Sequence, residues 1–494
     1  MIFVSRQLIP RHFFALLTAA LLASCGGSGG SQTAGIDGSG APVASSNTNG
    51  TIDGFGSVII NGVKYESDNA EVLINGQRAT ESELRVGYRV SVTGTTRNGK
   101  TSADKIEFIP SIVGEITALN PAAKTLVVLG KTIQVTNNTL FDAAIKPTSL
   151  AGLTLGQRIL VSGAVAADGS ISASRIELSS SESLQLTGQI ANLTGTSFNL
   201  NGTSVVYSGA QLINLEGNRF INGARVTVIG VMNNNQLQAS LVIGLNKTLS
   251  RDLDSADIEG FITRFASATD FDVDGISATT TNQTRFENGT RSDLRLGAKV
   301  EVEGTVNSNG ALVASDVEFE QDSNNKINGT VTAINLSSSI GNNNGIISGL
   351  LEVDGIAIST NKQTRYEDKQ LDVRRFNLAS LNLGDLVEVT GYSTADGFIA
   401  TKIERRDVDD DGDEGREFEG VISGIGADYF ILFGRKIYTT ADTQITGGDG
   451  EPLTPTAFYL IALNQQIEVR GNTINGEFYA SQIELEDEDL GDDD

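Results

Sequence analysis

Four aspartates in a short acidic stretch have the clearest potential for chemistry. Residues 407–413 read Asp-Val-Asp-Asp-Asp-Gly-Asp. This D-x-D-x-D-G pattern is typical of the start of an EF-hand loop, where alternate carboxylates bind calcium and a glycine makes the turn. The bidentate glutamate that closes such a loop is absent, because Phe418 stands at its position. A solvated acidic spacer is the interpretation we favour, and calcium binding is the alternative. The candidate calcium ligands are Asp407, Asp409, Asp411 and Asp413.

Most other catalytic and metal chemistry is excluded by residues that the chain lacks. Its 494 residues include one histidine, one cysteine and no tryptophan. The histidine, His12, lies in a predicted leader, and the cysteine, Cys25, directly follows it. Zinc sites, Ser–His or Cys–His nucleophile pairs and haem ligation all need such residues. We therefore expect a protein that is not an enzyme and that needs no cofactor, apart from the possible calcium.

A glycan hydrolase that uses only carboxylates is the remaining enzymatic alternative. Such an enzyme needs two acids that flank one glycosidic bond, and the chain has 61 acidic residues. One glutamate recurs at the same place in five of the six repeated segments, which favours an architectural role. These glutamates are Glu107, Glu177, Glu318, Glu404 and Glu484. No pattern in the sequence places two acids in one cleft.

The net charge of -25 limits the partners of the protein. An acidic surface repels the phosphates of nucleic acids and the headgroups of anionic lipids. Binding of single strands or sugars by stacking also favours tryptophan, which is absent. We expect no nucleic-acid partner.

The N-terminus predicts an exported, lipid-anchored protein. Residues 1–24 contain two arginines and a short apolar run, as secretory signals do. The tetrapeptide Leu-Ala-Ser-Cys at 22–25 resembles a bacterial lipobox, which implies acylation of Cys25. Gly26 follows the cysteine, and in such lipoproteins this implies sorting to the outer membrane, on its periplasmic face or at the cell surface. An ordinary signal peptide with an incidental cysteine is the alternative. Residues 25–48 are rich in Gly and Ser and predict a flexible tether.

The elements that would position any site belong to a cassette that recurs six times. The copy at 296–304 reads Leu-Gly-Ala-Lys-Val-Glu-Val-Glu-Gly. Its V-x-V alternation predicts a strand with one buried face. An Asn-Gly or Asp-Gly hairpin and a second strand follow in most copies. The closing glycines are Gly94, Gly163, Gly230, Gly304, Gly391 and Gly471, and seven residues earlier stand Gly87, Gly156, Gly223, Gly297, Gly384 and Asn464. This periodicity indicates an array of one small fold.

Each unit reads as three strands, a short helical turn and two more strands. This order predicts an all-β tandem array of about six five-stranded OB-like barrels. SH3-like barrels or small β-sandwiches are the alternatives. The predicted repeats are 49–110, 111–180, 184–245, 257–321, 326–406 and 417–486, with an acidic linker at 407–416 and an acidic tail at 487–494.

The motif order resembles the bacterial domain-of-unknown-function family DUF5666. The shared motifs are Gly-x-Ile, a hairpin, Thr-x-Phe, the glycine cassette and Ala-x-x-Ile-Glu, and together they cover about residues 49–486. Repeats three and six depart from this pattern. The resemblance implies tandem domains on an exported lipoprotein and brings no catalytic residues.

These observations predict a lipid-anchored envelope protein that is a non-catalytic binding or scaffold array. Its expected partners are the membrane, through the N-terminal lipid, and an envelope protein or polymer. A calcium-dependent adhesive or matrix protein is the second alternative, and the glycan hydrolase is the third.

Overall fold

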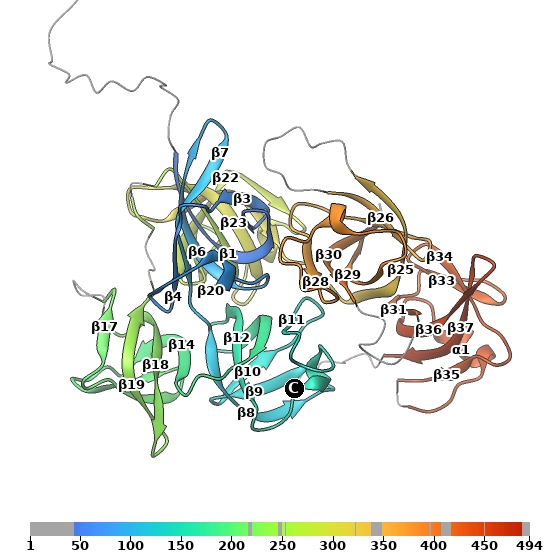
Figure 1. Ribbon diagram of the computed structural model, residues 1–494, viewed down its shortest axis with the longest axis horizontal. Helices are drawn as coiled ribbons and strands as arrows, with labels where there is room; N and C mark the ends of the chain where they lie inside the picture. The colour runs from blue at the N-terminus through green and yellow to red at the C-terminus, as the bar shows by residue number, and fades with distance from the viewer. Residues whose placement is uncertain are drawn as a thin grey trace, which may run out of the picture. The chain divides into compact units, whose positions relative to one another are not determined.

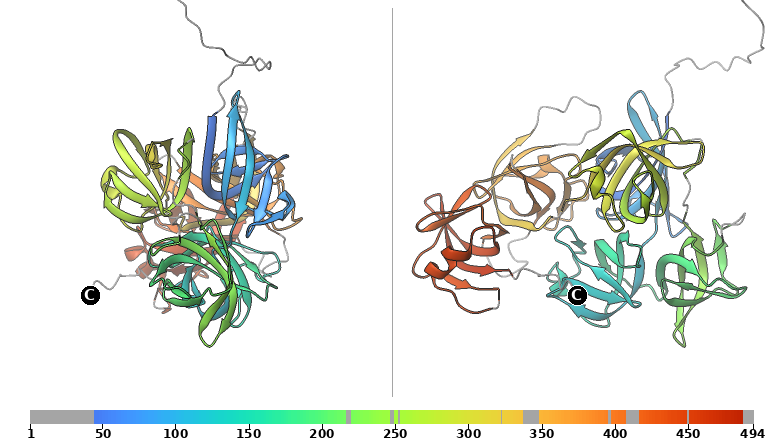
Figure 2. Two further views of the ribbon diagram at one scale, coloured as in Figure 1. Left: turned by 90° about the vertical axis from the view of Figure 1, so that its left-hand side faces the viewer. Right: turned by 180° about the vertical axis from the view of Figure 1, so that it is seen from behind.

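The computed structural model describes residues 44–215, 220–245, 249–251, 253–321, 323–336, 348–394, 397–406, 416–448 and 450–486. Figure 1 shows these residues as a series of small β-barrels, and Figure 2 shows the same barrels from two further sides. The predicted signal peptide, most of the tether, the acidic stretch 407–415 and the tail lie outside the described residues. Within the described part of the chain, no helix is long and apolar enough to cross a membrane.

The first three barrels contain strands β1 to β19. Barrel 1 comprises β1(Ala44–Phe55), β2(Val58–Ile60), β3(Val63–Glu66), β4(Glu71–Ile74), β5(Gln77–Ala79), η1(Glu81–Glu83), β6(Arg89–Arg97) and β7(Lys100–Phe108). Barrel 2 comprises β8(Ile112–Asn120), β9(Thr125–Val128), β10(Lys131–Gln134), β11(Leu140–Phe141), η2(Leu150–Gly152), β12(Arg158–Val165) and β13(Ile171–Leu178). Barrel 3 comprises β14(Leu184–Ala191), β15(Ser197–Leu200), β16(Thr203–Val206), β17(Gln211–Ile213), β18(Arg225–Asn233) and β19(Gln236–Gly244).

The last three barrels contain strands β20 to β37. Barrel 4 comprises β20(Ser255–Ser267), β21(Asp270–Val273), β22(Ile276–Glu287), η3(Arg291–Asp293), β23(Lys299–Val306) and β24(Leu312–Phe319). Barrel 5 comprises β25(Asn325–Leu336), β26(Gly349–Val353), β27(Ile356–Ser359), β28(Arg365–Asp368), η4(Leu378–Ser380), β29(Leu386–Thr394) and β30(Gly397–Arg405). Barrel 6 comprises β31(Arg416–Val421), β32(Gly424–Ile425), β33(Tyr429–Leu432), β34(Arg435–Tyr438), β35(Gln444–Thr446), α1(Pro455–Ile461), β36(Gln466–Ile474) and β37(Glu477–Leu485).

In barrels 1 to 5 the strand pairing closes on itself in the same order. In barrel 6 the first strand is divided into β31, which pairs with β36, and β32, which pairs with β33. In barrel 1, β1 pairs with β2, β2 with β3, β3 with β7, β7 with β6, and β6 with β1. Only the pair β3–β7 of this cycle is parallel. This cycle, with a helical turn before β6, is the OB-type barrel that the sequence predicts. The closure excludes a sandwich, and the parallel pair excludes an antiparallel SH3-like barrel.

The closing glycine of the cassette sits at a β-bulge in every barrel. In barrel 4 the register of β23 and β24 shifts between Glu303 and Gly304, which lies opposite Ala314. A Cβ on Gly304 would lie 2.0 Å from the carbonyl oxygen of Val313. The glycine and the small residue opposite it are therefore required because two backbones approach closely at the bulge.

We expect Gly304→Ala to destabilise barrel 4 by about 1–3 kcal/mol, because the facing strand must move away from the new methyl group. Gly195→Ala is the matched control, since a Cβ there meets nothing within 4 Å. Thermal unfolding of the two variants gives the comparison. An unchanged melting temperature for Gly304→Ala would contradict the steric account of the cassette.

The one irregular position of the cassette follows from backbone geometry. The glycine seven residues before the closing one has a positive φ in five barrels, as in Gly297 with φ 82°. In barrel 6 this position is Asn464, with φ 67°. Asparagine is among the few residues that adopt this left-handed conformation at low cost. The exception in the sequence therefore preserves the same turn.

Strand pairing also joins the barrels to one another. β1 pairs in parallel with β20, which connects barrel 1 to barrel 4. β8 pairs antiparallel with β14, and β25 pairs antiparallel with β31. β1 begins at Ala44, inside the predicted tether, because its first residues pair with β6 and β20. The barrels are therefore linked through backbone hydrogen bonds as well as through their connecting segments.

Candidate functional site

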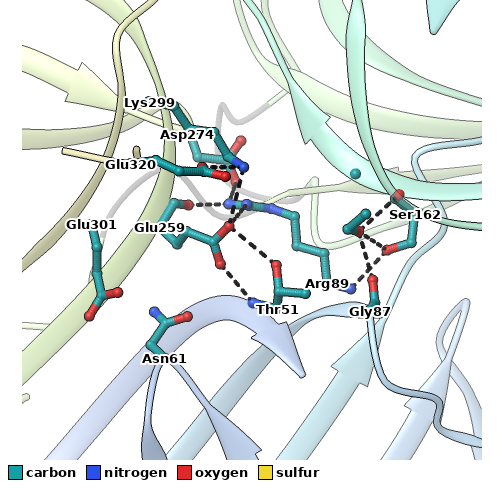
Figure 3. A network of polar contacts seen from close by, with 12 residues as sticks. Thr51, Asn61, Gly87, Arg89, Ser162, Glu259, Asp274, Lys299, Glu301 and Glu320 are labelled. Atoms are coloured by element: carbon teal, nitrogen blue, oxygen red, sulfur yellow. Dashed lines mark hydrogen bonds and ion pairs between the residues drawn. The ribbon is translucent and has the colours of Figure 1, made fainter. Parts of the chain in front are cut away.

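A buried arginine on β6 connects barrel 1 to barrel 4. Figure 3 shows the Arg89 guanidinium between Glu259 and Asp274, which both belong to barrel 4. Its Nη2 lies 3.1 Å from Asp274 Oδ2 and also donates to the backbone carbonyl of Glu259. Its Nη1 lies 3.7 Å from Glu259 Oε1. Glu259 in turn accepts from the backbone N–H of Thr51 at 2.9 Å. Arg89 thus brings a buried positive charge from barrel 1 to two acids of the neighbouring barrel.

Both acids are held in their ionised form by neighbouring cations. Burial opposes the ionisation of Glu259, but Arg89, Lys299 and Arg365 lower its pKa to about 2. Burial likewise opposes ionisation of Asp274, and two arginines lower the pKa of that carboxyl. The second of these is Arg225 of barrel 3, which donates to Asp274 Oδ1 and, at 2.7 Å, to its backbone carbonyl. The network therefore joins barrels 1, 3 and 4.

The turn that precedes β6 of barrel 1 contacts barrel 2. The Ser174 hydroxyl donates to the carbonyl of Gly87 at 2.6 Å, and the backbone N–H of Arg89 donates to Ser162 Oγ at 2.8 Å. Figure 3 shows Ser162 and Gly87 at the backbone end of Arg89, away from its guanidinium. The Tyr88 hydroxyl donates to Glu177 at 2.7 Å. The glycine turn therefore lies directly against the strands of another barrel.

An open cavity of about 560 Å³ adjoins this network. Its lining comes from barrels 1 to 4 and from the segment between β19 and β20. Arg89, Arg225 and Asp274 form one part of the wall. Asparagine, serine and threonine side chains of β1 and β6 form another part. A volume of this size is in the range of small-molecule sites.

A second junction contains buried acids whose pKa values are raised although Lys362 lies near them. Asp257 of β20 is 8% exposed and accepts from Asn61 Nδ2 at 3.0 Å. Burial raises the pKa of Asp257 to about 8, and Glu303 adds to the shift. Burial and Asp257 also raise the pKa of Glu301. Gln363 of barrel 5 donates to Glu301 at 2.9 Å and lines a cavity of about 100 Å³ beside it.

A third network joins barrels 2 and 5. Arg175 of β13 contacts Glu367 of β28, with 2.8 Å between Nη1 and Oε1. Lys369 contacts the same carboxylate at 2.6 Å. Burial opposes ionisation of Glu367, but Lys369 and Arg175 lower its pKa to about 2. The first and third networks thus share one feature, a buried carboxylate that contacts an arginine of another barrel.

The predicted site residues divide into two groups. Cys25 and the four aspartates at 407, 409, 411 and 413 lie outside the described residues. Of the recurring glutamates, Glu177, Glu318 and Glu404 contact neighbouring residues, with Lys402 2.7 Å from Glu404 and Gln363 3.2 Å from Glu318. Glu107 pairs with Lys105 at 3.3 Å, and Glu484 is exposed. In the described ranges, no three His, Cys, Asp or Glu side chains gather in a way that could hold a metal ion.

Sequence reasoning missed the residues that form the inter-barrel networks. Arg89, Glu259 and Asp274 occupy ordinary polar positions of strands and turns. The available signal was weak: Asp274 belongs to an Asp-Gly hairpin, and Arg89 precedes the V-x-V pair of β6. Such positions usually face solvent, and nothing local distinguishes one that meets another barrel.

These features define a protein built of tandem OB-type barrels that are joined by strand pairing and buried ion pairs. The sequence profile of DUF5666, described as a domain of unknown function, matches residues 113–177, 259–318, 328–404 and 419–484. The chain belongs to this family. The four matches fall on barrels 2, 4, 5 and 6, and barrels 1 and 3 share their strand order. Neither the curated proteins nor the solved structures include a match.

Proposed function

We propose that this protein is a non-catalytic binding scaffold, anchored in the bacterial envelope by a lipid on Cys25. The observation that carries the scaffold role is the strand pairing of β1 with β20, β8 with β14 and β25 with β31. Backbone pairing and buried ion pairs hold barrels in fixed contact, which suits a protein that presents surfaces rather than one that moves through a catalytic cycle.

The sequence supports the envelope location. The lipobox-like Leu-Ala-Ser-Cys at 22–25 would supply an acylated cysteine, and Gly26 favours the outer membrane. More than one acyl chain is needed for stable anchoring. The N-terminal cysteine of a lipoprotein would carry more than one. The expected partner is an envelope protein or polymer, and the acidic surface disfavours nucleic acid.

Labelling with a fatty-acid analogue tests the anchor. We expect the full chain to incorporate the label and to fractionate with outer membranes, and we expect Cys25→Ala to lose both properties. Ser24→Ala is a matched control that keeps the acceptor cysteine. An unlabelled wild-type chain in the soluble fraction would overturn the anchoring proposal.

Calcium dependence separates the adhesive alternative from the scaffold proposal. The acidic stretch lacks the closing glutamate of an EF-hand loop, so we expect the melting temperature of the full chain to be the same in EDTA and in excess calcium. A calcium-dependent rise that Asp409→Ala with Asp411→Ala abolishes would support the adhesive protein instead.

A further inference from the structure

The cavity beside Arg89 has a polar wall with a regular arrangement. Asn47 and Asn49 lie on β1, and Thr93 and Ser91 lie opposite them on β6. All four side chains are half-buried. Residues paired across strands have Cβ atoms about 5 Å apart. The wall therefore offers a small grid of amide and hydroxyl groups, each able to donate and to accept hydrogen bonds.

Another part of the cavity lining is aliphatic. Val165, Leu245, Leu249 and Leu253 contribute to it. Leu249 is only 6% exposed, and the others are buried or half-buried. A ligand that fills this space must combine a hydrogen-bonding edge with an apolar C–H face.

The charged groups of the wall are already compensated. Asp274 is shared by Arg89 and Arg225, and Glu107 lies 3.3 Å from Lys105. Among the described lining residues, Arg251 is the remaining charged side chain, and it is exposed. A charged ligand would lose hydration without gaining an unpaired buried counter-charge, which disfavours its binding.

From these three observations we propose that the cavity binds an uncharged, hydroxyl-rich ligand, a neutral saccharide, through hydrogen bonds to β1 and β6. The described lining residues include no aromatic ring, so recognition does not depend on stacking. This inference rests on the proposed function, because it requires a chain that binds its ligand without transforming it.

Calorimetric titration of the full chain tests the ligand class. The probes are maltose, cellobiose and N,N′-diacetylchitobiose, with glucuronate and glucosamine as charged counterparts. We expect at least one neutral disaccharide to bind, and the charged sugars to bind more weakly. Asn49→Leu with Thr93→Val should raise the Kd about tenfold, since each change removes hydrogen-bonding groups with little change in size.

The matched control is Asn335→Leu with Thr305→Val, at exposed positions of β25 and β23 that do not line this cavity. This pair should leave the Kd unchanged. The proposal would be overturned if both double variants lost affinity equally. It would also be overturned if glucuronate bound more tightly than the neutral sugars, or if no neutral probe bound.

A single introduced thiol gives an independent measurement. Cys25 is the only cysteine of the chain, so the Cys25→Ser, Thr93→Cys variant carries one thiol at the cavity wall. We expect the disaccharide that binds to slow its alkylation, and we expect no such protection of a Cys25→Ser, Thr305→Cys control. If no disaccharide slows alkylation, the saccharide proposal is rejected. The scaffold proposal stands separately, provided that the chain with Cys25 still incorporates lipid and its barrels still unfold together.

Discussion

Replacing Arg89 with alanine is expected to lower the free energy of unfolding by about 3–5 kcal/mol, the usual cost of removing one partner of a buried ion pair. The change leaves Glu259 and Asp274 of barrel 4 without the cation that β6 supplies. Arg225 still contacts Asp274, and Lys299 still lies 3.9 Å from Glu259, so each acid keeps one cation and loses the one that barrel 1 supplies. Calorimetry should show a lower melting temperature and an earlier separate transition for barrel 4.

Arg264→Ala is the matched control for this prediction. Arg264 also contacts two aspartates, Asp270 and Asp272, but its side chain is 45% exposed. Exposed pairs contribute about 0–1 kcal/mol, so the control should change stability little. Similar effects of the two substitutions would show that the Arg89 network does not hold the barrels together. Arg89→Lys should restore only part of the stability, because one ammonium cannot reproduce the forked contact.

Replacing Asp257 with asparagine is expected to stabilise the protein near neutral pH. Burial holds the pKa of Asp257 at about 8 rather than 3.8, so the folded chain keeps a proton that the unfolded chain releases between these values. The free energy of unfolding therefore falls as the pH rises through this window. Each pKa unit corresponds to about 1.4 kcal/mol, which makes the expected effect several kcal/mol.

Besides burial, the charged and polar groups that face Asp257 influence how far its pKa is raised. Glu259 and Glu303 disfavour its ionisation, while Lys362 and the amide of Asn61 favour it. Burial and Asp257 also raise the pKa of Glu301, so some pH dependence should survive in the variant. Asparagine can still accept from Asn61 at this position, so the contact that Asp257 makes at 3.0 Å is preserved.

Melting temperatures measured across this pH range check the prediction. We expect the melting temperature of Asp257→Asn to fall less with rising pH than that of the wild type. The control is Asp68→Asn, at an exposed position, and its melting temperature should follow the wild type. A variant that is less stable at every pH would mean that Asp257 is ionised and paired in the folded chain. If the melting temperature of the variant depends on pH as that of the wild type does, groups other than Asp257 titrate in this range.

The local fold could be predicted from the sequence because its constraints are local. Each V-x-V strand alternates between core and surface; Val300 and Val302, for example, are both almost fully buried. Tight turns require residues that accept positive φ, and Gly297 marks one of them. A close backbone approach requires glycine, as at Gly304. Such demands repeat at fixed spacing, so six similar barrels are visible without a structure.

The relations between barrels could not be predicted in the same way. β1 pairs with β20, which lies some two hundred residues later in the chain, although barrels 2 and 3 come between them. Arg89 meets Glu259 and Asp274 for the same reason. The outer face of a barrel strand is polar whether it meets water or another barrel, so sequence composition does not separate the two cases.

The sequence by itself determined the repeat, the barrel, the turns and the glycine bulge, because backbone geometry restricts the residue types at those positions. The tertiary structure alone decided which barrels pair, which carboxylates become buried at a junction, and where a polar cavity forms beside Arg89. Those features depend on outward-facing side chains from distant segments, whose meeting is set by packing of whole barrels rather than by any local pattern.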